Sequence, residues 1–156
     1  MALGGVLAAL AVVIMAMGTL IPVATFVCPV LVMMILQMVL KSCGSRVAWA
    51  WYGAVAILGL LMAPDKEAAA IFAFLGYYPI VKPKLDARKG KWLWKALLFN
   101  TAMGVMYFLL LSLLGMSEIA AEYAEMGTVL TIVMLILGNI TFFLLDRLLS
   151  MRLKIR

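Results

Sequence analysis

The hydrophobic pattern of this chain consists of five long uncharged runs separated by short charged segments. Residues 1–40 carry no charged side chain, and uncharged runs follow at 47–64, 68–81, 96–117 and 126–145. A helix rises about 1.5 Å per residue and needs about 20 apolar residues to cross a hydrocarbon core about 30 Å thick. The first run is long enough for two crossings and each later run for one. The pattern predicts an all-α, polytopic membrane bundle of six transmembrane helices.

Glycine and proline signals give the expected bounds of these spans. Gly18 and Pro22 punctuate the first run and predict a hairpin there, because Pro22 suits the first turn of a following helix. The spans are expected at about residues 3–18, 22–40, 47–64, 66–81, 94–116 and 126–146 of one transmembrane domain covering 1–156. The fourth is the weakest, and it reaches membrane length only if the acidic segment 65–67 forms its first turn.

The charges between the runs predict the orientation. With the N-terminus inside, segments 41–46, 82–95 and 146–156 hold 12 of the 13 Lys and Arg residues, and the outer segments hold five of the seven acids. This is the distribution of the positive-inside rule. We expect both termini to be cytoplasmic in a multi-pass protein of the cell (plasma) membrane, bacterial in type. The net charge of +6 then indicates anionic lipid headgroups as partners and argues against nucleic acid.

The inner segment 82–95 contains six of these basic residues. Pro79 and Pro83 predict that the fourth helix ends before this segment, because proline lacks a backbone donor and restricts its predecessor. A turn and a short interfacial helix over 86–95, broken at Gly90, are expected to follow. Lipid attraction accounts for the basic composition. An interfacial aromatic belt is expected at the same boundary, and it comprises Trp49, Trp51, Tyr52, Tyr77, Tyr78, Trp92 and Trp94.

The sequence offers little for catalysis or for metal binding. It has no histidine, which removes the usual general base and the commonest metal ligand. Cys28 and Cys43 are about 22 Å apart along one predicted helix, too far for a disulfide, and neither has a metal-ligand partner. Asp146 adjoins Arg147, which predicts a solvated ion pair. We expect neither an enzyme nor a bound metal or cofactor. No ionisable residue lies inside a predicted span, whereas a carrier driven by an ion gradient usually needs one to bind the coupling ion. A solute carrier of this kind would take its energy from a partner.

Two asparagines lie inside predicted spans. Asn100 and Asn139 fall at similar depth in the antiparallel fifth and sixth spans. An amide in hydrocarbon seeks a partner, and interhelical bonds of this kind contribute ~0.6–2 kcal/mol. We expect the two side chains to bond each other or to share a water cluster. A helix-to-helix contact is the favoured interpretation, and a substrate contact is the alternative.

The first predicted helix carries a stripe of small residues. Gly4, Ala8, Ala11, Met15 and Gly18 follow heptad-like spacing. Small residues let helices approach closely in lipid, where packing drives association. The stripe packs within the bundle or docks a separate protein, and the residues leave both alternatives open.

These features together resemble a known family. The chain is similar to the S component, the substrate-binding subunit of energy-coupling factor transporters. The shared features are six helices with both ends inside, an alanine-rich first helix, a proline-containing second helix and a short fourth helix. The resemblance implies uptake of a small solute, a vitamin or micronutrient. It also implies a transmembrane coupling protein and an ATPase pair as partners, with Gly4, Ala8 and Ala11 as the docking face.

The resemblance also implies a substrate pocket at the outer ends of the helices. The candidate residues there are Thr25, Asp65, Lys66, Glu67, Glu122 and Tyr123. Lys66 is the one basic residue expected outside, and with an acid on each side it suits a zwitterionic solute. The alternative is a solvated turn with a good helix start.

Two other functions compete with transport. A membrane scaffold of the bacterial rod-shape type has a similar topology and binds partners without moving a solute. A homo-oligomeric channel ranks last, because no predicted helix carries a polar stripe that would line a pore.

Overall fold

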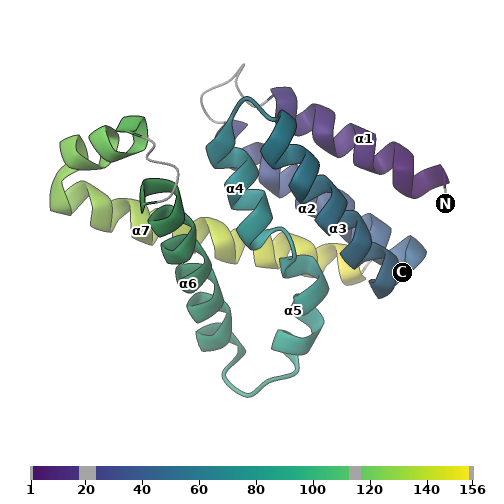
Figure 1. The fold of residues 1–156 in the computed structure, drawn as a ribbon. Helices are drawn as coiled ribbons and strands as arrows, with labels where there is room; N and C mark the ends of the chain where they lie inside the picture. The colour runs from purple at the N-terminus through teal and green to yellow at the C-terminus, as the bar shows by residue number, and fades with distance from the viewer. Residues whose placement is uncertain (1, 18–23, 113–116, 155–156) are drawn as a thin grey trace. The chain divides into compact units, whose positions relative to one another are not determined.

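A computed structural model describes residues 2–17, 24–112 and 117–154, and the predicted hairpin around Gly18 and Pro22 lies outside them (Figure 1). The described part of the chain is all-α, as predicted. Its helices are α1 (Ala2–Ala16), α2 (Ala24–Cys43), α3 (Ser45–Met62), α4 (Lys66–Leu75), α5 (Tyr78–Asp86), α6 (Lys91–Ser112) and α7 (Ser117–Lys154).

The chain divides into two compact units where the sequence led us to expect one domain. Unit 1 comprises Met1–Lys91 and unit 2 comprises Trp92–Arg156. Unit 1 contains α1 to α5, and unit 2 contains nearly all of α6 together with α7.

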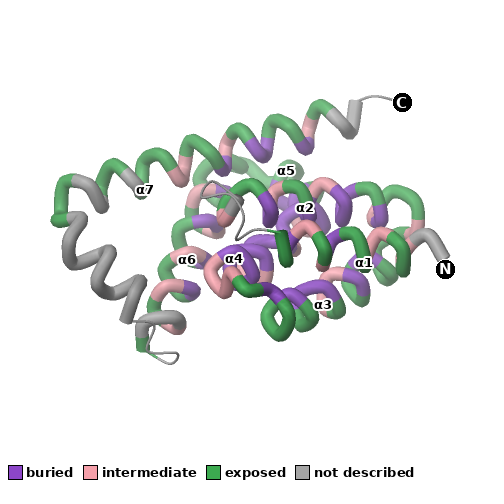
Figure 2. Tube along the Cα trace, turned by 90° about the horizontal axis from the view of Figure 1, so that it is seen from above, coloured by how far each residue is buried: buried purple, intermediate pink, exposed green. Residues whose placement is uncertain are grey.

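Helix α2 is the centre of unit 1. It contacts α1, α3, α4 and α5. Its most buried residues, Val32, Leu36 and Val39, are fully covered and recur at a helical spacing that gives one apolar face. The buried stretches of α1 to α4 lie on their facing sides in Figure 2. Unit 1 is thus a bundle packed around its second helix.

Two helices in the described ranges are long and apolar enough to cross a membrane. They are Thr25–Cys43 with 19 residues and Ser45–Met62 with 18 residues, and Gly4–Ala16 is a shorter apolar helix. The two long helices coincide with the second and third predicted spans. This finding rests on length and composition.

The fourth predicted span, over residues 66–81, is not one continuous helix. Helix α4 has 10 residues and ends before Gly76, and α5 begins at Tyr78. The interruption follows from Pro79, which stands in the first turn of α5 and has no N–H for the carbonyl of Leu75. Gly76 is also sterically required, because a Cβ there would meet Cε2 of Phe72 at 2.7 Å.

The prediction for the inner segment is also wrong. Helix α5 continues through Pro83 to Asp86, and no helix covers 86–95 as one element. Pro83 removes one helical bond, but an ion pair of 3.3 Å between Lys82 and Asp86 spans the same turn and supports it. The break at Gly90 is present: its φ of +74° is a conformation that glycine adopts without penalty, and α6 starts directly after it.

Helix α7 consists of two helical stretches that meet at Gly127. This glycine has φ 66° and ψ 168°, a region that is essentially restricted to glycine. The second stretch begins where the sixth span was expected to begin. The first stretch is helical where we expected an outer loop over 118–125, because its charged residues do not prevent a helix and an early acid suits the helix dipole.

Candidate functional site

A polar cluster forms where α3 ends and α4 begins. Asp65 is the N-cap of α4, and its Oδ1 accepts a hydrogen bond of 3.0 Å from the backbone N–H of Ala68. Its Oδ2 accepts a bond of 2.7 Å from the hydroxyl of Thr25. The cluster therefore joins the start of α2 to the start of α4, and it brings together two of the residues that were expected around a substrate.

Lys66 and Glu67 lie in the first turn of α4 beside this cap. The Lys66 ammonium donates a hydrogen bond of 2.9 Å to the carbonyl of Leu60, in the last turn of α3, where a cation suits the helix dipole. An ammonium has three donors, and each carboxylate oxygen of Asp65 has two lone pairs. The cluster can thus offer both a donor and an acceptor to a zwitterionic solute.

The other two residues of the predicted pocket have no described side chains. Glu122 and Tyr123 belong to the first stretch of α7 in unit 2. Their side chains lie outside the described part of the structure. In unit 1, Thr25 and Asp65 are thus in contact, and Lys66 and Glu67 follow them in the first turn of α4.

The small-residue stripe of α1 packs against α3 inside unit 1. The carbonyl of Gly4 accepts a hydrogen bond of 3.0 Å from the indole N–H of Trp51. Ala11 and Met15 are fully buried, and Met15 lies so close to Gly59 that a Cβ there would be 2.9 Å from its Cε. Of the two open alternatives, the structure shows packing within the bundle. Of the residues in the implied docking face, Ala11 is covered by the chain itself, the Gly4 carbonyl is bonded and Ala8 is half-exposed, and docking of a separate protein stays a prediction.

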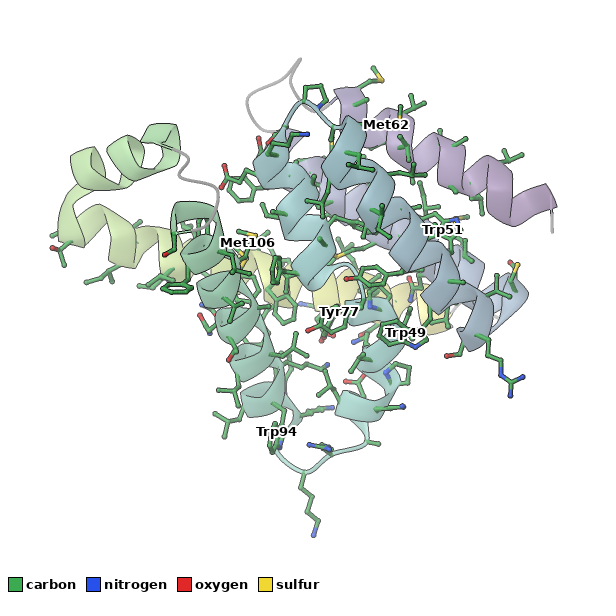
Figure 3. The ribbon with its side chains drawn as sticks, in the orientation of Figure 1. Trp49, Trp51, Met62, Tyr77, Trp94 and Met106 are labelled. Carbon is green, nitrogen blue, oxygen red and sulfur yellow. The ribbon has the colours of Figure 1, made fainter. Side chains whose placement is uncertain are left out.

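Three residues of the predicted aromatic belt form a cluster of rings in unit 1. Ring centroids of Trp49, Tyr52 and Tyr77 lie 5.9, 6.1 and 6.3 Å from one another, and Trp49 and Tyr77 are stacked (Figure 3). The hydroxyl of Tyr52 donates to the carbonyl of Ala73, one turn before the break between α4 and α5. Trp51 and Tyr78 are buried and so do not belong to an exposed belt.

An ion pair joins the two helices of unit 2. The ammonium of Lys95 on α6 donates to both carboxylate oxygens of Asp146 on α7, at 3.0 and 2.9 Å, and the side chains are only 3% and 7% exposed. The expected solvated pair of Asp146 with Arg147 is therefore wrong. The signal that would have found Lys95 is depth, because both residues stand at the expected inner ends of the predicted fifth and sixth spans.

An amide pair joins the same helices further along. Asn100 and Asn139 exchange two hydrogen bonds, each 3.1 Å long, which is the mutual contact expected from the sequence. Each amide also donates within its own helix, to the carbonyls of Ala96 and Leu135 at 2.8 and 2.9 Å. All four amide N–H groups are thus directed to protein acceptors, as in a structural contact.

Comparison with known proteins gives no family assignment. No protein-family model, no curated protein and no solved structure matches this chain. The function has to be argued from the side chains and the helices that hold them.

Proposed function

We propose that this chain is a membrane protein with six spans and cytoplasmic termini. We further propose that it is the substrate-binding subunit of a small-solute uptake transporter energised by a separate ATPase module. Helices α2 and α3 have the length and composition of spans. In this arrangement α1, α6 and the second stretch of α7 are further spans, and α4 with α5 forms the remaining one.

The observation that carries the proposal is the break between α4 and α5. Helix α4 has 10 residues, or about 15 Å, so the break would fall near the middle of a core about 30 Å thick. Broken helices at mid-depth are typical of transporter binding sites, because the freed backbone groups need partners away from lipid. Here the Tyr52 hydroxyl bonds the Ala73 carbonyl beside the break. A passive bundle has no need of such an interruption.

The polar cluster at the other end of α4 supports a solute site on the outer side. It combines the Thr25 hydroxyl, the Asp65 carboxylate and the Lys66 ammonium. These groups match a small zwitterionic solute, since each charge of the solute meets an opposite one. The uncharged runs of the sequence contain no charged residue that could bind a coupling ion. ATP hydrolysis by a partner would therefore supply the energy.

The test is recovery of the tagged full chain from native membranes in mild detergent. A coupling protein and two ATPases in stoichiometric amounts are expected, together with a small solute in the extract. Lys66→Ala should lower the amount of solute without lowering the amount of partner, and Lys41→Ala, an exposed lysine elsewhere, is the matched control. Recovery of the chain without any ATPase would contradict the proposal.

A scaffold of the rod-shape type is the second candidate. The specific observation in its favour is the outward side of α1, opposite the packed stripe, where Val6, Leu10, Val13 and Met17 are exposed. Such a face can contact a partner helix in the membrane. Recovery of cell-wall or division proteins in place of ATPases would favour this candidate, and a lone oligomer would favour a channel.

A further inference from the structure

The structure divides the basic residues between α5 and the start of α6 into two groups. Lys82 and Lys95 are almost fully buried and form ion pairs, with Asp86 and Asp146 respectively. The other four are exposed: Lys84, Arg88, Lys89 and Lys91. The segment therefore contains a surface group of four cations within eight residues, and its one acid, Asp86, is paired with a buried lysine.

From this arrangement we infer that Lys84, Arg88, Lys89 and Lys91 form a binding surface for anionic lipid headgroups. The inference rests on the membrane location in the proposed function. Lys82 and Lys95 are buried and cannot reach a headgroup, whereas these four side chains are exposed and can. We call these four residues the lipid-binding surface.

The neighbouring tryptophans favour a lipid over an acidic protein as the occupant. Trp92 and Trp94 follow directly in the first turn of α6 and are 56% and 43% exposed. Figure 3 shows Trp94 at the start of this helix. Tryptophan is enriched at headgroup depth, and cations act on an anionic membrane surface within a Debye length of about 8 Å. Exposed cations and exposed indoles in one short segment match that boundary.

The conformation of the segment keeps the four cations together. Helix α5 ends at Asp86, and the left-handed Gly90 turns the chain before α6 begins at Lys91. A Cβ at Gly90 would meet no atom within 4 Å, so the turn is not packed against the rest of the protein. The basic side chains are therefore presented on an open turn.

The test compares lipid binding by two triple variants of the full chain. In Lys84→Gln/Lys89→Gln/Lys91→Gln the lipid-binding surface keeps one cation. The matched control, Lys84→Arg/Lys89→Arg/Lys91→Arg, keeps a cation at each of these exposed positions. Each protein is purified in detergent and titrated with phosphatidylglycerol, cardiolipin or phosphatidylcholine. Bound lipid is counted by native mass spectrometry, and circular dichroism checks the helix content.

We expect the first variant to lose anionic-lipid affinity by about tenfold or more, because one juxtamembrane cation near an anionic surface is worth roughly fivefold. The control should change by less than about threefold, and phosphatidylcholine binding should not change in either protein. Equal losses in both variants would overturn the inference, because the charge at these positions would then not determine binding. Full competition by inorganic phosphate would also overturn it, as would loss of an acidic partner protein with lipid binding intact.

A separate measurement distinguishes this inference from the proposed function. Alkaline washing of membranes leaves an integral protein in the pellet. If the wild-type chain is washed off, the proposed membrane location fails. If it stays in the pellet but shows no preference for anionic lipid, only the inference about the lipid-binding surface fails.

Discussion

The two units hold their polar groups in different ways. In unit 1, the bonds at helix ends and breaks go to backbone groups: Trp51 to the Gly4 carbonyl, Tyr52 to the Ala73 carbonyl, and the Asp65 carboxylate to the Ala68 N–H. Two side-chain pairs, Thr25 with Asp65 and Lys82 with Asp86, accompany them. In unit 2, side chains pair with side chains, as in Lys95 with Asp146 and Asn100 with Asn139. Bonds to backbone satisfy helix ends and breaks, whereas matched pairs specify which residues of two helices face each other.

This difference predicts different sensitivities. Unit 1 depends on close contacts at Gly59 and Gly76, so added volume should damage it. Unit 2 depends on complementary partners, so removal of one partner should damage it more than removal of both. The following changes test this contrast, from the largest expected effect to the smallest.

Removal of the carboxylate from the buried ion pair should have the largest effect. Asp146→Ala leaves the ammonium of Lys95, whose side chain is 3% exposed, without its carboxylate, and breaking a buried pair in this way costs about 3–5 kcal/mol. The measurement is the free energy of unfolding of the purified protein in mixed micelles.

Two further variants sharpen this result. Arg147→Ala, at an exposed neighbouring position, should change the free energy by less than about 0.5 kcal/mol. The double variant Lys95→Met/Asp146→Leu should recover most of the loss, because no charge is left unpaired. A loss for Asp146→Ala no greater than that for Arg147→Ala would show that the pair does not stabilise unit 2.

Added volume at the break in unit 1 should have the next largest effect. Gly76→Ala would bring a Cβ against the carbonyl oxygen and the ring of Phe72, and overpacking of this kind costs about 1–3 kcal/mol. Thermal unfolding of the purified protein measures the change. The control is Gly53→Ala, where no atom lies within 4 Å of the new Cβ. It should leave stability unchanged or raise it by up to about 1 kcal/mol, because alanine favours a helix. Equal effects of the two variants would contradict the packing argument.

Loss of the α4 cap should have a moderate effect. Asp65→Ala removes the acceptor for the Ala68 N–H and for the Thr25 hydroxyl, and loss of an N-cap costs about 0.5–2 kcal/mol. Asp65→Asn keeps an oxygen for the cap and should retain most of the stability, as measured by chemical unfolding. If Asp65→Asn is as unstable as Asp65→Ala, the charge and not the cap is what stabilises this end of α4.

Loss of the amide pair should have the smallest effect. Asn100→Leu removes the mutual bonds with Asn139, and interhelical bonds of this kind average about 0.6 kcal/mol. A double-mutant cycle with Asn139→Leu isolates the coupling energy. Thr141→Val is the control, because the Thr141 hydroxyl bonds only the Leu137 carbonyl of its own helix among the described residues. A coupling energy near zero would mean that the amides do not specify how α6 faces α7.

The sequence by itself determined much of the helical framework, because hydrophobic runs and glycines act locally. It predicted helices close to the observed α2, α3 and α6, the break at Gly90, and the start of the second stretch of α7. It also predicted the contact between Asn100 and Asn139, since residue counts give depth along antiparallel helices. These conclusions needed only the rise of a helix and the conformational preferences of single residues.

Only the tertiary structure decided which partner each polar or small residue takes. The nearest charge to Asp146 in the chain is Arg147, yet the carboxylate bonds Lys95, 51 residues away. The stripe of α1 suited either a partner protein or the bundle, and its burial against α3 depends on the Trp51 indole and on the space at Gly59. Such choices depend on which helices become neighbours, and a buried group bonds whatever acceptor or donor its surroundings bring within reach. Spacing along one helix fixes a face, but the opposing helix determines what that face contacts.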